Sequence, residues 1–238
     1  MKKIVLALIL SLSVLPAHAA DFSNWAVMVI AGDNHSHSGG PSQVFDNARR
    51  DLVKAFAGIG FTPDNIAQFS VTPDKDAMQT DAQTIATTLW DLTNRAPGGC
   101  LIYYTSHGTP QGIIMDRGQM TPPNWGSIVN NACGAKPAVV VMSACFAGQF
   151  VPVLAGGNRM VMTAARPDRT SFGCGDDDHL TFFDGCFLQS LPGVGNFRDL
   201  ALATQRCVAT LESQMKVDYP SEPMIAYGKD FGDTLKWR

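Results

Sequence analysis

The stretch LIYYTSHGTP, residues 101–110, decides the fold because a continuous apolar run passes directly into a polar tip. The run lacks the polar alternation of a strand with one face in water, so it predicts a strand buried on both faces. A second stretch, AVVVMSACFAG at 138–148, has the same form. His107 ends the first run and Cys145 ends the second. The question is whether these two residues belong to one site.

Further apolar runs alternate with helical patterns along the chain. Continuous runs predict three more strands, WAVMVIAG (25–32), IAQFSV (66–71) and RMVMTAA (159–165), and a final edge strand, PMIAYG (223–228). Apolar residues spaced by three and four predict a helix over 44–60, a capping box at Thr80 and Gln83 predicts a second, and Asn196 is expected to cap a last helix. This alternation predicts an α/β fold, with helices on both faces of a mostly parallel central sheet. Ligands of such sheets lie beyond the carboxyl ends of the strands, where both His107 and Cys145 fall.

The N-terminus has the three parts of a secretory signal peptide. Lys2 and Lys3 precede the apolar run IVLALILSLSVL, and AHA at 17–19 is a small-x-small cleavage site. The apolar run is shorter than the roughly 20 residues needed to span a bilayer. We therefore predict a signal peptide over 1–19, a single domain over 20–238 and export. The MKK start favours a bacterial periplasm, with release from the cell as the alternative.

Charge and composition exclude several partner classes. The chain has 18 Lys and Arg and 21 Asp and Glu; without Lys2 and Lys3 the balance is 16 minus 21, or −5. This mild acidity is opposed to the basic face that nucleic-acid binding requires. No later run is long enough to span a membrane, so we expect neither nucleic-acid nor membrane partners after signal removal. The oligomeric state is left open.

Metal and cofactor sites are not expected. Asp33, His35 and His37 in the stretch DNHSHSGG could ligate a metal, but no cysteine or third histidine lies at a zinc-binding spacing. These histidines are more consistent with a loop that lines the substrate side.

Six cysteines remain after the signal peptide, which suits an oxidising compartment. They lie at 100, 133, 145, 174, 186 and 207. If Cys145 stays free, at least one more cysteine is unpaired. We expect Cys174 to pair with Cys186 because the two flank one loop, and Cys100 to be buried in its strand.

His107 and Cys145 together suggest nucleophilic catalysis, although each alone has a structural explanation. A histidine after a strand is commonly a capping or hydrogen-bonding residue, and a cysteine behind an apolar strand is commonly a small core residue. Here both end neighbouring strands, and Gly108 and Gly148 follow them. A thiolate can attack a carbonyl, an imidazole can move the proton, and open backbone amides can hold the oxyanion.

These motifs resemble those of the legumain-like family of cysteine peptidases, which are relatives of the caspases. YYTSHG is followed by SACFAG, with Cys145 38 residues after His107. The segments MVMTAARPDRTSFGC (160–174) and FDNARRDL (45–52) are also similar to family segments, so the resemblance covers most of 25–190. It implies a caspase-like three-layer sandwich and an exported bacterial member.

The resemblance also implies a mechanism. His107 and Cys145 would form a catalytic dyad, with a thioacyl-enzyme on Cys145 and protonation of the leaving amine by His107. The amides of Gly108 and Cys145 would form the oxyanion hole, no cofactor would be needed, and the partner would be a peptide or protein substrate. A transpeptidase or amidase with the same dyad, or a non-catalytic caspase-like binding module, are the alternatives.

Substrate-binding residues follow less directly from the resemblance. Family members that cut after asparagine use an arginine, an acid and an aspartate, whose positions Ser42, Phe146 and Asp184 occupy here; Ser171, in the loop after the third apolar strand, is a fourth candidate. With two of the three polar groups replaced, asparagine preference is not implied. The acidic run GDDDH (175–179) could attract a basic side chain, or could be a solvated loop or a calcium-binding turn.

Overall fold

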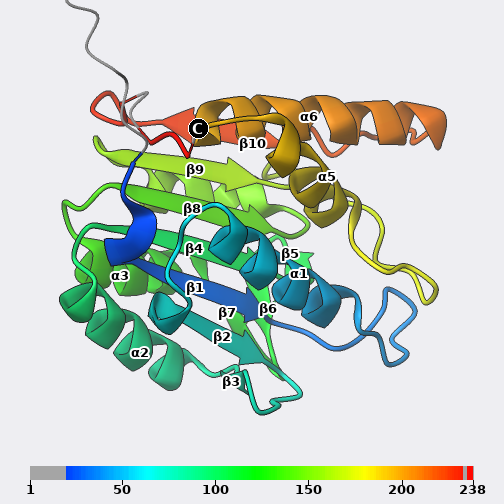
Figure 1. The fold of residues 1–238 in the computed structure, drawn as a ribbon. Coiled ribbons are helices and arrows are strands. Elements are labelled where there is room, and N and C mark those ends of the chain that lie inside the picture. The colour runs from blue at the N-terminus through cyan, green and yellow to red at the C-terminus, as the bar shows by residue number, and fades with distance from the viewer. Residues whose placement is uncertain (1–19, 233–234, 238) are drawn as a thin grey trace, which may run out of the picture.

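A seven-stranded sheet forms the centre of the molecule in a computed structural model, which describes residues 20–232 and 235–237. The strand order is β10-β9-β8-β4-β1-β2-β3 (Figure 1). All neighbours are parallel except β10, the edge strand, which is antiparallel to β9. The strands are β1 (Trp25–Ala31), β2 (Ile66–Ser70), β3 (Met78–Gln79), β4 (Gly99–Thr105), β8 (Ala138–Ser143), β9 (Arg159–Thr163) and β10 (Met224–Tyr227). The mostly parallel sheet and the position of β10 at its edge were predicted from the sequence and are confirmed, whereas the antiparallel direction of β10 was not predicted.

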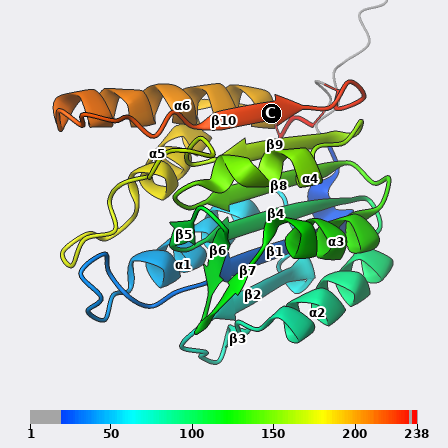
Figure 2. The same ribbon diagram turned by 180° about the vertical axis from the view of Figure 1, so that it is seen from behind.

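Helices cover both faces of this sheet. One face carries α1 (Val44–Gly58), α5 (Phe182–Ser190) and α6 (Phe197–Gln214), and the other carries α2 (Ala82–Arg95), α3 (Pro122–Cys133) and α4 (Val151–Leu154) (Figures 1 and 2). Alternate residues of β1 enter the two cores: Met28 packs in the α2–α3 core and Val27 in the α1–α5–α6 core. Because strand side chains alternate between faces, a continuous apolar strand is what a sheet in the middle layer requires. The predicted three-layer α/β sandwich is confirmed.

Short elements complete the fold. A small antiparallel sheet follows β4 directly and consists of β5 (Gly108–Thr109), β6 (Gly112–Met115) and β7 (Gly118–Met120). The 3₁₀ turns are Phe22–Asn24, Pro63–Asn65, Ala147–Phe150 and Leu191–Gly193. No helix among the described residues is long and apolar enough to cross a membrane. The predicted signal peptide, 1–19, lies outside the described residues.

The helix caps agree only in part with the sequence. Asn196 caps α6 as expected, since its side chain accepts from the Asp199 amide at 2.9 Å. The capping box predicted for α2 is wrong: Asp81 is the cap and accepts from the Thr84 amide at 2.9 Å. Thr80 is buried one residue earlier, and its hydroxyl donates to the carbonyl of Ala31. The Thr80 hydroxyl therefore joins the segment after β3 to the end of β1 instead of capping α2.

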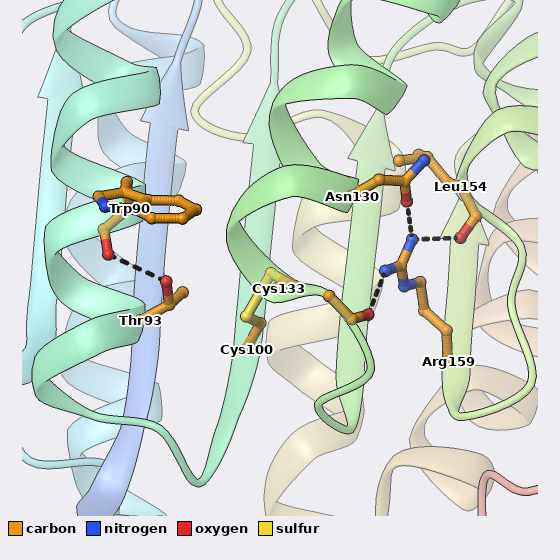
Figure 3. The surroundings of a disulfide bond; sticks show 8 residues. Trp90, Thr93, Cys100, Asn130, Cys133, Leu154 and Arg159 are labelled. Atoms are coloured by element: carbon orange, nitrogen blue, oxygen red, sulfur yellow. Dashed lines mark hydrogen bonds between the residues drawn. A yellow bond between two sulfur atoms is a disulfide. The ribbon is translucent and has the colours of Figure 1, made fainter.

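Two disulfides correct the expected cysteine pairing. Cys100 at the start of β4 is bonded to Cys133 at the end of α3 (Figure 3), and Cys186 of α5 is bonded to Cys207 of α6. Cys186 lies on the buried face of α5, which packs on α6, so the expected bond from Cys186 to Cys174 is not formed. Cys145 and Cys174 are the free cysteines among the described residues.

Arg159 adds a second link between α3 and the sheet beside the first disulfide (Figure 3). It is 6 % exposed, and its guanidinium donates to Asn130 Oδ1 at 2.5 Å and to the Leu154 carbonyl at 3.0 Å. A buried guanidinium with several carbonyl and amide acceptors is well satisfied. These links hold α3 against the end of the sheet at which β4, β8 and β9 begin.

The strand register shows how the strands are aligned at their carboxyl ends, the carboxyl edge of the sheet. Thr105 of β4 lies between Ala31 of β1 and Ser143 of β8, and Met142 of β8 lies beside Thr163 of β9. The loops after these strands therefore emerge together. Figure 1 shows the loop after β1 in blue and the loop after β9 in yellow, both extending beyond this edge.

Candidate active site

His107 and Cys145 lie beside each other at the carboxyl edge of the sheet. Each lies two residues beyond a member of the register pair Thr105 and Ser143, and the Ser106 amide donates to the Ser143 carbonyl at 3.1 Å, which extends the pairing. Gly108 packs directly on the backbone of Cys145, since a Cβ built on it would lie 1.9 Å from the Cys145 carbonyl oxygen. The topology thus brings the two residues singled out in the sequence to one place.

The imidazole of His107 has one nitrogen already engaged. Its Nε2 lies 3.1 Å from the backbone carbonyl oxygen of His35, and Phe45 contacts the ring edge-on with centroids 5.0 Å apart. Because a carbonyl oxygen only accepts, the proton of the neutral ring lies on Nε2 and Nδ1 is left as the basic nitrogen. The contact of His107 with the His35 carbonyl could not be predicted from the sequence, because every residue type supplies a backbone carbonyl.

The loop that carries the His35 carbonyl is held by Asp33. The Asp33 carboxylate is 8 % exposed and accepts from His35 Nδ1 at 2.7 Å, the Asn34 amide at 2.7 Å and the His35 amide at 3.1 Å. His37 does not join them; it lies in the wall of a cavity on the far side of the loop. Within the described residues, no group of three or more His, Cys, Asp or Glu is arranged to hold a metal ion.

The sulfur of Cys145 is contacted by Ser171, the candidate from the loop after β9. The Ser171 amide donates to Sγ at 3.3 Å, and the Ser171 hydroxyl lies 3.6 Å from the same atom. An amide aimed at the sulfur meets the negative charge of a thiolate. Ser171, a residue predicted for the site, therefore contacts the Cys145 sulfur directly.

Two backbone amides are open beside the sulfur. The Ile114 amide donates to the His107 carbonyl at 2.9 Å, so His107 and Ile114 are a hydrogen-bonded pair of the small sheet. The next pair, Gly108 and Ile113, is then a non-hydrogen-bonded pair, because the two kinds of pair alternate between antiparallel strands. The Gly108 amide therefore points away from β6. Among the described residues, no acceptor is paired with the amide of Cys145. Free amides on adjoining segments are what an oxyanion hole needs.

A cavity of about 360 Å³ opens next to Cys145. It is lined by His37, Cys145, Thr170, Ser171, Phe172, Gly173, Cys174 and Gly175. A separate cavity beside it is lined by Pro41, Ser42, Gln43, Asn47, Asp176, Asp177, Asp178 and His179. The pKa of Cys174 is raised to about 11, mainly by burial of the thiol and to a smaller extent by the nearby Cys145 and Asp178. The cavity next to the sulfur therefore contains a neutral thiol at neutral pH.

Comparison with known proteins identifies the family. Residues 35–194, more than half of the chain, match the family model described as Peptidase C13 family. The chain belongs to the Peptidase C13 family. A legumain-like, caspase-related membership is thereby confirmed, and the protein is a cysteine-type peptidase, a hydrolase that acts on peptide or protein substrates.

The fold of this C13 peptidase is caspase-like. It is similar to the crystal structure of caspase-1 from Spodoptera frugiperda, with a TM-score of 0.63 and 13 % sequence identity over 94 % of each chain. At this identity the likeness establishes the fold alone. No curated protein matches the chain.

Two of the predicted substrate-binding residues of the C13 peptidase, Ser42 and Phe146, do not line the cavity next to Cys145. Ser42 is 8 % exposed, accepts from the Val44 amide at 3.2 Å and lines the neighbouring acidic cavity. Phe146 has a left-handed backbone with φ of 57°, and its amide donates to the Arg169 carbonyl at 2.8 Å. Strained backbone in a non-glycine residue is typical of functional loops, and here it turns the chain directly after Cys145.

Asp184 is placed where no substrate reaches it, which corrects its expected role in substrate binding. It is 0 % exposed under the sheet, and its carboxylate accepts from the Tyr103 and Thr105 hydroxyls, each at 2.7 Å. Its position on α5, packed against β4, directs it into the core instead of the cavity. We assign Asp184 the structural role of joining α5 to the end of β4.

Burial of Asp184 makes the stability of the protein depend on pH. Burial raises the pKa of this carboxyl above its ordinary value of 3.8, although the hydroxyl donors act in the opposite sense. The folded state therefore keeps the proton to a higher pH than the unfolded state, and stability falls as the pH rises above 3.8. Asp184→Asn lacks this titration, so its free energy of unfolding should rise relative to that of wild type as the pH increases. We expect this difference to grow by about 1.4 kcal/mol for each pH unit that lies between the pKa of Asp184 in the unfolded state and its higher pKa in the folded state.

Urea unfolding across the acidic to neutral range measures this dependence. Asp91→Asn, a change at an exposed position of α2, is the matched control and should leave the slope of wild type unchanged. Parallel pH profiles for Asp184→Asn and wild type would contradict the raised pKa.

Proposed function

We propose that this C13 peptidase is an exported cysteine endopeptidase in which Cys145 is the nucleophile and His107 the acid–base residue. The observation that carries the proposal is the register of β4 and β8. It places both residues two positions beyond a hydrogen-bonded strand pair and packs Gly108 on the Cys145 backbone. β4 and β8 are neighbouring central strands of the sheet, so their paired ends hold the two residues at a fixed spacing.

The chemistry follows from the protons and lone pairs of the site. His107 Nδ1 takes the thiol proton as Cys145 Sγ attacks the scissile carbonyl carbon, and the amides of Gly108 and Cys145 face the oxyanion. The attack forms a tetrahedral intermediate. Its collapse breaks the C–N bond and leaves the acyl group on Sγ as a thioester, and His107 gives the proton to the leaving amine. The thioester is then attacked by water, whose proton passes to His107, and release of the acid restores the thiol. The His35 carbonyl holds the imidazole with its Nε2 proton throughout.

An amine in place of water would turn the same thioester into a transpeptidation or amidation product. Hydrolysis and aminolysis share every residue named above, so they are separated by product analysis in the presence of a peptide amine. A free acid as the main product supports the endopeptidase, and a new amide as the main product contradicts it.

Export is proposed from the signal-like N-terminus. Lys2, Lys3, the apolar run and AHA at 17–19 support cleavage after Ala19 and a periplasmic or secreted protein. N-terminal sequencing of protein recovered from the cell envelope or the medium should begin near Ala20. A cytoplasmic protein that retains Met1 would contradict export.

Selective alkylation tests the nucleophile. We expect iodoacetamide at neutral pH, without reductant, to label Cys145 at least about tenfold faster than Cys174. Burial holds the pKa of the Cys174 thiol at about 11, so only about one part in ten thousand is thiolate at neutral pH. Peptide mass mapping over time gives both rates, and loss of peptide hydrolysis should follow the labelling of Cys145.

The other four cysteines serve as internal controls, because they are in disulfides and should stay unlabelled. An unreactive or disulfide-bonded Cys145, or activity that survives complete labelling of Cys145, would overturn the proposed function.

A further inference from the structure

The cavity beside Cys145 indicates which side chain the enzyme accepts, an inference that rests on the proposed function. His107 protonates the leaving amine, so the leaving half of the substrate lies on the His107 side of the sulfur. The cavity lining includes Cys145 but neither His107 nor Gly108. It therefore lies on the acyl side, where the residue before the scissile bond projects.

The walls of this cavity carry no carboxylate and no guanidinium or ammonium group. Phe172 supplies an aromatic ring, Gly173 and Gly175 supply backbone, and Cys174 supplies a thiol that also packs against the apolar cluster of Ala31, Val44 and Phe45. The polar groups of the lining are His37, Thr170 and Ser171, and Ser171 is already engaged with the Cys145 sulfur.

The acidic run lies next to this cavity, but its side chains do not line it. Asp176 accepts from the hydroxyls of Ser36 and Ser38, and Asp178 accepts from the Gly175 amide at 2.7 Å. With Asp177, these residues line the separate cavity that contains Ser42. Asp176 thus ties the loop after β1 to the loop after β9, and Asp178 is bonded within the loop after β9. None of the three carboxylates belongs to the lining of the cavity beside Cys145.

The shape of the cavity is fixed by the same two loops. The His37 amide donates to the Cys174 carbonyl at 2.7 Å, and the Phe182 amide donates to the Phe172 carbonyl at 2.9 Å. Gly173 has φ of +86°, and a Cβ there would lie 2.6 Å from the Phe182 amide nitrogen. The wall is therefore held on both sides and approaches α5 closely at a position that requires glycine.

We propose that this cavity is the pocket for an uncharged, apolar side chain at the residue before the scissile bond, with Phe172 and Cys174 as its specificity-determining residues. A charged side chain would lose its water shell there without meeting an opposite charge. Leucine, methionine or phenylalanine would be buried against the ring and the thiol. This preference differs from one for asparagine, aspartate or a basic residue.

Fluorogenic peptides that differ only at this residue test the proposal on the purified full chain. We expect kcat/KM for Leu, Met or Phe to exceed that for Asn, Asp, Arg or Lys by at least about tenfold. The variant Cys174→Asp places a carboxylate in the pocket and should raise the Arg-to-Leu ratio of kcat/KM by about a hundredfold. Cys174→Ser, neutral and similar in size, should keep that ratio within about threefold of wild type.

Asp177→Asn is the control for the neighbouring cavity and should leave the ratio unchanged. A wild-type preference for Arg, Lys, Asn or Asp would overturn the proposal even if Cys174→Asp failed to fold. A folded Cys174→Asp with the wild-type ratio would also overturn it. Absence of any Cys145-dependent cleavage would overturn the proposed function itself, so the two failures are distinguishable.

Discussion

Cys145→Ala should lower kcat/KM for a peptide substrate by about 10⁴-fold or more, because it removes the proposed nucleophile and the other free thiol, Cys174, is held in its neutral form by its raised pKa. The free energy of unfolding should change by less than about 1 kcal/mol, because the side chain is half-buried and makes only weak sulfur contacts with Ser171. Steady-state kinetics and thermal unfolding of the same preparation measure the two effects together.

His107→Ala should lose activity by a similar factor, since a nucleophile and its base act as one unit and their losses do not add. Ser127→Ala, a change at an exposed position of α3 whose hydroxyl donates only to the Pro123 carbonyl, is the matched control and should retain wild-type kinetics. Full activity in His107→Ala would refute the assigned dyad, and residual turnover in Cys145→Ala within tenfold of wild type would refute the nucleophile.

Gly108→Ala should produce the second large effect, through geometry alone. The added methyl group would lie 1.9 Å from the Cys145 carbonyl oxygen and 3.1 Å from its amide nitrogen. Both are backbone atoms, so the two loops must move apart. A displacement of about 1 Å between reacting groups can lower the rate about a hundredfold. We expect at least that loss of kcat/KM, with a loss of about 1–3 kcal/mol in the free energy of unfolding from overpacking.

Gly58→Ala is the matched control for Gly108→Ala. Gly58 ends α1, and a Cβ there would meet no atom within 4 Å. The same chemical change should therefore leave activity unaltered and raise stability by up to about 1 kcal/mol, as alanine is the better helix former. Gly108→Ala with wild-type kinetics would show that the close approach of the two loops is not needed for catalysis.

The fold could be predicted because its strands are apolar on both faces. AVVVMS and LIYYT have no polar alternation, and only the middle layer of a sandwich buries such strands completely. The same reasoning placed His107 and Cys145 at one edge, because parallel strands end together. The edge strand β10 was predicted in the sequence as well, although its antiparallel direction came from the structure.

The parts that could not be predicted depend on contacts between distant segments. The acceptor for His107 is the backbone of His35, which leaves no mark in the sequence. Asp184 was expected in the substrate site from the family resemblance, but α5 turns its carboxylate inward to Tyr103 and Thr105. Cys186 was expected to pair across a short loop, whereas helix packing decides in favour of Cys207. In each case chain separation was a poor guide to distance in space.

The mass of the acyl-enzyme tests the central claim most directly. Purified protein is mixed with a peptide p-nitrophenyl ester that ends in leucine, quenched in acid within the first turnover, digested and mapped by mass spectrometry. We predict a p-nitrophenol burst about equal to the enzyme concentration and the peptidyl mass on Cys145, with neither in Cys145→Ala. Turnover of the ester with no adduct on Cys145, or with the adduct on another residue, would contradict it.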